Sequence, residues 1–169
     1  MLLVDRDVLL KAGRDVAVPT EPSGELSAPA KPVPVPDDES RPFFDGALEG
    51  KLMLRRCRSC GTFMWPVGGV IATPLRPRCV ECFSGELEWA PASGKGTLYS
   101  FVLMHQVYDP AFAGEVPYNI AMVELEEGVR MTTNVVGCAN DQLEIGMPLE
   151  VTFERLSEHV ALPKFRPVG

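Results

Sequence analysis

Short runs of mixed apolar and polar residues dominate the second half of the chain. Between residues 96 and 165 there are five such runs, separated by Gly, Pro or Asp/Asn turn residues. The runs read GTLYSFVLMHQV, YNIAMVELE, VRMTTNVVG, MPLEVTFERL and HVALPKF. No long helical period interrupts them. Five short strands in so few residues predict a small closed barrel, and the OB-fold is a barrel of this strand number.

The segment before these runs has a different pattern. In PFFDGALEG, Phe43, Phe44 and Leu48 would share one face of a short helix, and Gly50 could end that helix in the left-handed conformation. The runs LMLRRC and TFMWPV follow, broken by glycine and cysteine, as is typical of hairpins. The sequence therefore predicts a short helix and then a small hairpin module.

The first 41 residues are rich in proline. Seven of the 16 prolines fall between Pro19 and Pro42. Because proline lacks an amide donor and favours extended backbone, we predict a polyproline-like arm or linker. Two interpretations stay open: a disordered tail, or an arm that becomes ordered against a partner subunit.

The composition is that of a soluble globular protein. The chain has 169 residues, of which 46% are hydrophobic and 23% charged, enough for one ordinary domain or two small ones. No apolar run approaches the roughly 18–20 residues that cross a bilayer, so no membrane association is expected. Asp5, Arg6 and Asp7 interrupt the apolar start, which argues against a secretory signal and for a cytoplasmic protein.

Charge is distributed unevenly along the chain, whose net charge is −7. Residues 51–95 hold seven basic and three acidic side chains, a net charge of +4, whereas residues 96–160 hold two basic and ten acidic, a net charge of −8. A nucleic-acid-binding protein usually presents a broad basic face. The acidic barrel region therefore makes a zinc-ribbon and OB-fold nucleic-acid-binding module the less favoured alternative.

The cysteines carry the most specific signal. Four of the five form two C-x2-C pairs separated by eighteen residues, namely Cys57, Cys60, Cys79 and Cys82. This spacing is typical of a zinc ribbon, in which each pair forms a knuckle and four thiolates surround one ion. Gly61 supplies a permissive backbone after the first pair. A ribbon this small buries little apolar surface, so the metal would contribute much of its folding free energy.

Other chemistry at these cysteines is possible. Thiols stay reduced in the cytosol, which argues against disulfides. An iron site of the rubredoxin kind uses the same four-sulfur geometry, so iron stays open beside zinc. Four thiolates would fill every coordination position. We therefore expect a structural metal rather than a catalytic one.

No catalytic arrangement can be assembled from the sequence. Cys138 ends an apolar run with no cysteine or histidine near it, which favours a buried thiol. His105 and His159 have no spacing that links them to a nucleophile or to a carboxylate pair. The chain is therefore not expected to be an enzyme by itself, although a self-sufficient thioesterase or hydrolase is a second alternative.

Several phrases together resemble a known family. In order they are PFFDGALEGKL, RRCRSCGTFMWP, RPRCVECFSGELEW, SGKGTLYSF, VPYNIAMVELEEGVRMTTNVVG and IGMPLEVTFE, ending in ALPKFRP. They resemble the rubredoxin-like zinc ribbons fused to an acyl-CoA-associated OB-fold, long known as a domain of unknown function. The resemblance covers about residues 42–168. It implies a mainly β chain with an extended arm (1–41), a short helix and zinc ribbon (42–92) and a five-stranded OB-fold barrel (93–169).

The resemblance also implies a role. Members of that family are accessory subunits of thiolase-fold enzymes, including thiolases, acyltransferases and the aldolases of steroid side-chain breakdown. The expected partner is thus a thiolase-fold catalytic subunit in a heterotetramer or larger hetero-oligomer, with an acyl-CoA as the shared ligand. The opening aromatic pair is often Phe-Trp in the family and is Phe43-Phe44 here. The first 41 residues have no counterpart in the family core.

Basic residues around the ribbon are candidates for the acyl-CoA phosphates, since phosphates are bound by Arg and Lys. They are Arg55, Arg56, Arg58, Arg76, Arg78 and Lys95. The plainer interpretation is solvated charge, or neutralisation of the metal–thiolate cluster. The apolar side chains that could line a slot or an interface, or simply belong to the core, are Met64, Trp65, Trp89, Phe101 and Tyr118.

Overall fold

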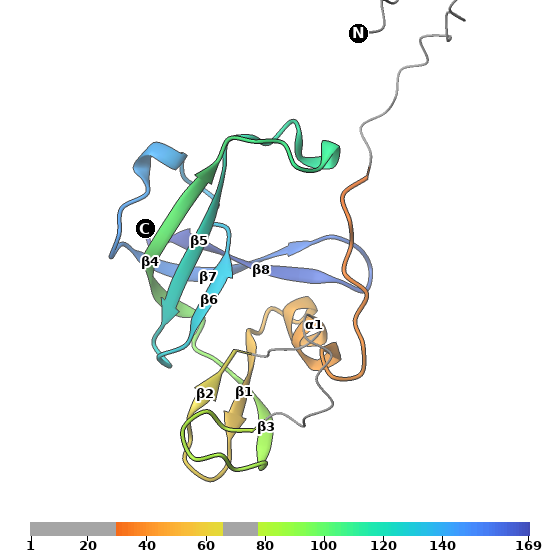
Figure 1. The fold of residues 1–169 in the computed structure, drawn as a ribbon, viewed down its shortest axis with the longest axis vertical. Coiled ribbons are helices and arrows are strands. Elements are labelled where there is room, and N and C mark those ends of the chain that lie inside the picture. The colour runs from red at the N-terminus through yellow and green to blue at the C-terminus, as the bar shows by residue number, and fades with distance from the viewer. Residues whose placement is uncertain (1–29, 66–77) are drawn as a thin grey trace, which may run out of the picture.

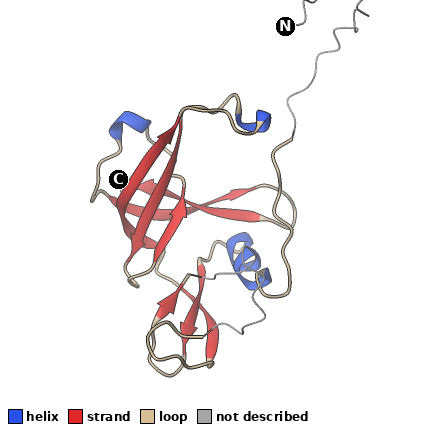
Figure 2. Ribbon diagram, in the orientation of Figure 1, coloured by secondary structure: helices blue, strands red, loops and turns tan. Residues whose placement is uncertain are grey.

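The structure, a computed structural model, describes residues 30–65 and 78–169, and it is mainly β (Figures 1 and 2). One helix precedes a three-stranded sheet of strand order β2-β1-β3 and a five-stranded sheet of strand order β6-β5-β4-β7-β8. The bounds are α1 Arg41–Leu48, β1 Met53–Cys57, β2 Phe63–Met64, β3 Leu87–Pro91, β4 Lys95–Met104, β5 Tyr118–Leu125, β6 Arg130–Thr133, β7 Pro148–Arg155 and β8 Ala161–Pro167. Two short 3-10 helices, η1 Pro110–Phe112 and η2 Asn140–Gln142, lie in the connections.

The predicted helix is present as α1. A turn with two reciprocal hydrogen bonds precedes the helix. The Ser40 amide donates to Asp37 Oδ1 at 2.7 Å, and the Asp37 amide donates to Ser40 Oγ at 3.0 Å. Pro42 lies in the first turn, where a missing amide donor costs nothing. Beyond the end of the helix, Gly50 has φ of +76°, as its left-handed prediction required.

The five predicted strands form one antiparallel sheet that curls into a half-barrel. A β-bulge between Leu98 and Ser100 bends β4, the longest strand. Where the curled edges meet, Val135 forms a parallel bridge with Phe165 of β8. Phe165 donates to the Asn134 carbonyl at 3.0 Å, and Val136 donates to the Phe165 carbonyl at 2.8 Å. The OB-fold prediction is confirmed, although the sheet is a half-barrel and not the fully closed barrel that the strand count predicted; in the described residues this bridge links its two edges.

The two sheets share one hydrophobic core. Leu54 belongs to β1, and Leu52 directly precedes that strand. Both lie in one buried cluster with half-barrel residues, among them Leu98, Met131 and Phe165. Leu54 and Phe165 are fully buried. The ribbon is therefore anchored to the half-barrel through apolar packing, which fixes the ribbon in one orientation.

The glycines of the SGKG phrase are required by close packing. Gly94 has φ of +72°, and a Cβ there would overlap the side chain of Val151. A Cβ at Gly96 would overlap the main-chain carbonyl of Glu124 on the neighbouring strand. The phrase thus marks the place where β4 enters the sheet, because only glycine allows these backbones to approach so closely.

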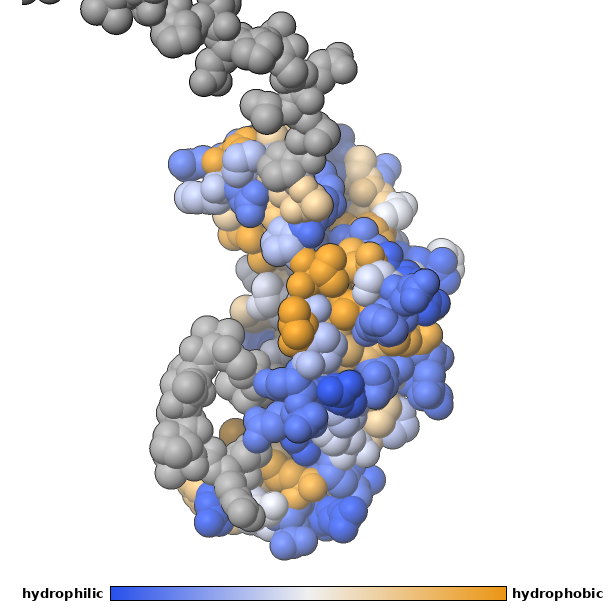
Figure 3. Space-filling model, turned by 90° about the vertical axis from the view of Figure 1, so that its right-hand side faces the viewer, coloured by the Kyte–Doolittle hydropathy of each residue, from blue (hydrophilic) through white to orange (hydrophobic). Residues whose placement is uncertain are grey.

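Part of the proline-rich arm lies on the half-barrel. Residues 30–36 are extended and run beside the β7–β8 hairpin toward α1 (Figure 1). Lys31 forms an ion pair with Glu115 and lies 5.5 Å from the ring centroid of Phe112. Figure 3 looks onto this side of the molecule and shows apolar atoms gathered at its middle. The remaining arm residues, 1–29, are outside the described part of the chain.

Within residues 30–65 and 78–169, no helix is long and apolar enough to cross a membrane.

Candidate metal centre

Two loops of matching backbone geometry carry the four cysteines. In the first, the Gly61 amide donates to the Cys57 carbonyl at 2.9 Å; in the second, the Phe83 amide donates to the Cys79 carbonyl at 3.0 Å. The residue after each cysteine pair has a positive φ, +80° at Gly61 and +58° at Phe83. The two C-x2-C motifs therefore fold into the paired knuckles that their spacing predicts.

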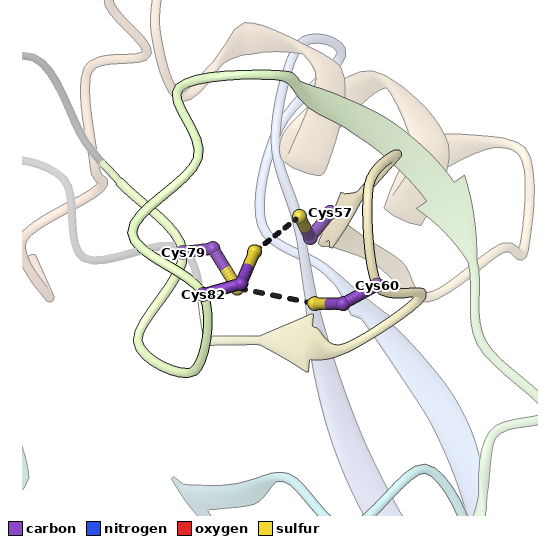
Figure 4. Close-up of side chains that lie close together, drawn as sticks. All are labelled: Cys57, Cys60, Cys79 and Cys82. Atoms are coloured by element: carbon purple, nitrogen blue, oxygen red, sulfur yellow. Dashed lines mark hydrogen bonds between the residues drawn. The ribbon is translucent and has the colours of Figure 1, made fainter.

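The knuckles face each other and bring all four sulfurs together (Figure 4). Cys57 Sγ lies 3.6 Å from Cys82 Sγ, Cys60 Sγ lies 3.5 Å from Cys79 Sγ, and all four atoms lie within 4.8 Å of one another. Cys57 and Cys79 are buried, whereas Cys60 and Cys82 are exposed. The cluster thus lies at the surface of the ribbon, with one sulfur of each knuckle directed inward.

This arrangement fits a tetrahedral ion. With Zn–S bonds of about 2.3 Å, the edges of a tetrahedron of sulfurs measure about 3.8 Å, close to the shortest distances between the knuckles. A hydrogen bond with the Thr62 hydroxyl lowers the pKa of Cys60 to about 6, so this thiol ionises readily. Four neighbouring thiolates would repel one another strongly unless a cation lay between them.

Polar contacts join the two knuckles independently of a metal. Arg58 Nε donates to Glu88 Oε2 at 2.8 Å, and the Arg58 amide donates to the Glu86 carbonyl at 2.8 Å. Ser59 Oγ donates to Ser84 Oγ at 2.9 Å. These contacts hold the first knuckle against the chain that follows the second, which brings the two cysteine pairs into register.

Five of the six basic candidates lie in the described part of the chain, and the structure gives them different surroundings. On the ribbon sheet, Arg55 Cζ lies 4.3 Å from the ring centroid of Trp89. Arg56 Cζ lies 5.6 Å from the ring centroid of Phe63. Arg58 is paired with Glu88. In the described part of the chain, neither Arg55 nor Arg56 forms an ion pair, so their guanidinium N–H groups stay available for hydrogen bonding.

The other basic candidates have different surroundings. Arg78 Nη1 donates to the Phe83 carbonyl at 3.1 Å, beside the second knuckle. Lys95 lies in a shallow cavity of about 490 Å³ together with Glu124, Glu126 and Glu150, which makes its surroundings acidic. Arg76 is outside the described residues. Acyl-CoA binding by the six stays a prediction.

The five apolar candidates do not line one common slot. Trp65 and Phe101 pack against the core, and Trp65 meets Phe43 edge to face at 5.6 Å. Tyr118 lies 6.2 Å from Phe112 at the other end of the half-barrel. Met64 ends the short strand β2 and is half-buried.

A polar network that the sequence did not single out forms one wall of a larger cavity. This cavity, of about 970 Å³, lies between the arm, the chain near η1, the segment after β6 and the β7–β8 hairpin. Asn119 is buried and donates to Asn140 Oδ1 at 3.0 Å, while Asn140 donates to the Pro117 carbonyl at 2.8 Å. The signal was present in the run YNIAM, since asparagine is rare inside an apolar strand.

The remaining candidate nucleophile and bases are not brought together. Cys138 lines the larger cavity, and burial raises the pKa of its thiol. His105 and His159 are both exposed. A raised pKa leaves little thiolate at neutral pH, which is the opposite of what a nucleophilic cysteine needs.

Comparison with known proteins agrees with this architecture. The family model described as "ChsH2, rubredoxin-like zinc ribbon domain" matches residues 44–70, and the one described as "ChsH2, C-terminal OB-fold domain" matches residues 89–154. The fold and the cysteine cluster thus define a rubredoxin-like zinc ribbon followed by an OB-fold.

Relatives cover different shares of the chain. It is 35% identical over 148 residues to a probable enoyl-CoA hydratase alpha subunit of Thermomonospora curvata, across 88% of this chain and 43% of that subunit. It is 37% identical over 103 residues to a DUF35 domain-containing scaffold protein of Methanocaldococcus jannaschii, across 61% of this chain and 67% of the scaffold protein. A chain of the solved structure "Ltp2-ChsH2(DUF35) aldolase" is 36% identical with a TM-score of 0.64, across 80% of this chain and 98% of that one.

The chain belongs to the DUF35 family. It spans less than half of the length of the hydratase subunit that it matches. Residues 42–169 alone are too few for a match of 148 residues, so that match includes part of the N-terminal arm, for which the family resemblance gave no counterpart.

Proposed function

We propose that the chain is a non-catalytic accessory subunit of a thiolase-fold enzyme that acts on an acyl-CoA thioester. The ribbon docks the catalytic subunit, and the half-barrel helps to enclose the CoA-bearing substrate. The partner would be a thiolase, an acyltransferase or a retro-aldolase. The two proteins together form a hetero-oligomer of at least two copies of each.

One observation carries this proposal. The match to a chain of the solved structure "Ltp2-ChsH2(DUF35) aldolase" extends over 98% of that chain, which supports ribbon and half-barrel acting as one unit. The shared core that includes Leu54 and Phe165 gives the reason, because it makes the pair a rigid scaffold rather than two tethered domains. The hydratase subunit of Thermomonospora curvata adds a second relative whose name contains a CoA thioester substrate.

We propose zinc as the ion of the four-sulfur cluster, held by Cys57, Cys60, Cys79 and Cys82. Four thiolates leave no position for water or substrate, so the ion would contribute folding free energy and rigidity and would take no part in the reaction. Iron would suit the same ligands, and elemental analysis of the purified chain distinguishes the two metals. One equivalent of zinc is the expected result.

For the acyl-CoA phosphates we propose the basic side chains of the ribbon. Arg55 and Arg56 are the strongest candidates, because each lies over an aromatic ring and neither forms an ion pair among the described residues. Arg58, Arg78 and Lys95 have protein partners or acidic neighbours.

We also assign the arm to residues 1–41, the ribbon to 42–92 and the half-barrel to 93–169, and we place the protein in the cytoplasm.

Co-purification tests the accessory role. Tagged chain is isolated from its native host under mild conditions, and the proteins recovered with it are identified by mass spectrometry. We expect a thiolase-fold protein in fixed stoichiometry, and acyl-CoA turnover by the complex but by neither protein alone. Recovery of the chain only by itself would contradict the proposal, as would acyl-CoA hydrolysis by the isolated chain.

A double variant tests the phosphate proposal. Arg55→Ala combined with Arg56→Ala should raise the KM for acyl-CoA and leave assembly unchanged.

A further inference from the structure

The second knuckle contains an unusual backbone conformation. Phe83 is the one non-glycine residue with a positive φ in the ranges 30–65 and 78–169. A bulky side chain in the left-handed region is sterically unfavourable, because its Cβ crowds the backbone. Yet the Phe83 side chain gains little from its own chain in return, since 71% of its surface is exposed. Its conformation and its exposure therefore both cost stability in the isolated chain.

The first knuckle shows that this cost is avoidable. Gly61 occupies the corresponding position with φ of +80° and the same hydrogen bond back to the first cysteine. Glycine adopts this conformation without steric penalty. The two knuckles therefore satisfy the same backbone requirement with different residues, and only the second places an aromatic ring at the surface.

The side chains of the second knuckle are also more apolar. Val80, inside its C-x2-C loop, is 68% exposed. The corresponding residue of the first knuckle is Arg58, which is paired with Glu88, and the next is Ser59, which is bonded to Ser84. The first knuckle thus uses its polar side chains within the chain. The second presents two large apolar side chains, Val80 and Phe83, to the outside.

We propose that Val80 and Phe83 form the anchor by which the ribbon binds the catalytic subunit, an inference that rests on the function proposed above. A rigid aromatic side chain that enters a pocket of its partner is a typical source of binding free energy. The knuckle is held by main-chain hydrogen bonds from Cys79 to Ser84 and from Phe83 to Cys79, so little conformational entropy is lost on binding.

The charge around this anchor indicates the surface that would receive it. The charge next to the anchor is mixed, because Arg78 contacts the Phe83 carbonyl and the exposed Glu81 lies between Val80 and Phe83 in the sequence. The matching surface of the catalytic subunit is an apolar pocket with a basic group toward Glu81 and a carboxylate toward Arg78.

The experiment compares variants for binding and for folding. Phe83→Gly removes the ring and the backbone strain together, Phe83→Asn keeps a side chain that tolerates the left-handed region, and Ile145→Ser removes a similarly exposed apolar side chain on the half-barrel, 72% exposed. Each is titrated by calorimetry against the thiolase-fold protein identified by co-purification. Metal content and the midpoint of thermal unfolding are measured on the same samples.

The expected result separates folding from binding. Phe83→Gly should keep its metal and unfold at the same or a higher temperature than the wild-type chain, and it should bind the partner about tenfold more weakly or worse. Phe83→Asn should behave in the same way, and Ile145→Ser should bind normally. Wild-type affinity in Phe83→Gly overturns the anchor while leaving the accessory role intact. No binding by the wild-type chain overturns both, and loss of self-association on Phe83→Gly shows a contact between copies instead.

Discussion

The side chain of Asn119 pairs with both main-chain polar groups of Val135. Its Oδ1 accepts from the Val135 amide at 2.7 Å, and its Nδ2 donates to the Val135 carbonyl at 2.8 Å. Both residues are buried, so neither main-chain group has water as an alternative partner. The side chain thereby replaces a strand neighbour just where the chain leaves β6 and crosses to Phe165 of β8.

Replacing Asn119 should therefore weaken the closure of the half-barrel. Asn119→Ala leaves a buried N–H and C=O of Val135 without partners, and we expect a loss of about 2–4 kcal/mol in the free energy of unfolding. Urea unfolding followed by circular dichroism measures it. Gln106→Ala, in an exposed turn, is the control and should stay within about 0.5 kcal/mol of the wild-type chain. A loss below 1 kcal/mol for Asn119→Ala would show that the pairing contributes little.

A second prediction concerns the entry of β4 into the sheet. Gly96→Ala forces a methyl group against the Glu124 carbonyl, which belongs to backbone and cannot rotate away. We expect about 1–3 kcal/mol of destabilisation, measured by thermal unfolding. At Gly114 a Cβ would meet nothing within 4 Å, so Gly114→Ala should be neutral or stabilising by up to about 1 kcal/mol. Equal stability of the two variants would contradict the close approach of β4 and β5.

The metal proposal predicts a difference between two cysteines. Cys79→Ser removes a buried member of the four-sulfur cluster and should abolish stoichiometric zinc and unfold the ribbon, because the ion contributes much of its stability. Cys138→Ser, at the distant cavity, should retain one zinc per chain. Inductively coupled plasma mass spectrometry gives the stoichiometry. Because protons compete for thiolates, zinc should be released as the pH falls. Full zinc content in Cys79→Ser would exclude the proposed ligand set.

The turn before α1 gives a pH-dependent prediction. Hydrogen bonds from the side chain and amide of Ser40 lower the pKa of Asp37 below its ordinary value of 3.8. Since the folded-state pKa is the lower one, the stabilisation by this carboxylate is complete above pH 3.8 and is lost as the pH falls through the lowered value. An NMR titration of the Asp37 carboxyl carbon measures the shift. Ser40→Ala should return the pKa toward 3.8, whereas Ser59→Ala should not change it; an unchanged pKa in Ser40→Ala would refute the assigned cause.

Much of the fold could be predicted because local signals agree with one another. Polar and glycine-rich breaks between apolar runs indicate turns directly. Gly128 and Gly146 lie in such breaks, and both have the positive φ that favours glycine. The cysteine spacing likewise needs no long-range information within each knuckle. The proximity of Cys57 and Cys82 was predictable for another reason, namely that a metal ion bound by four thiolates needs both cysteine pairs. No local conformational preference indicates it.

Other features could not be predicted, because they depend on residues far apart in sequence. The pairing of Asn119 with Val135 appears only when β5 and the segment after β6 are aligned. The exposure of Phe83 is equally invisible in sequence, where an aromatic residue is by default assigned to a core. The packing of the arm through Lys31 and Glu115 joins segments 84 positions apart, and no pattern in either segment indicates the other.

By itself, the amino-acid sequence determined the order of helix, ribbon and five strands, the two C-x2-C pairs and the uneven charge, because each depends on composition and on spacing over a few residues. Only the tertiary structure decided that Leu54 and Phe165 share one core, that the edges of the sheet meet at Val135, and that the second knuckle directs its apolar side chains outward. The physical reason is that burial and strand pairing are properties of the whole packed chain, whereas turns and ligand spacing are properties of its short segments.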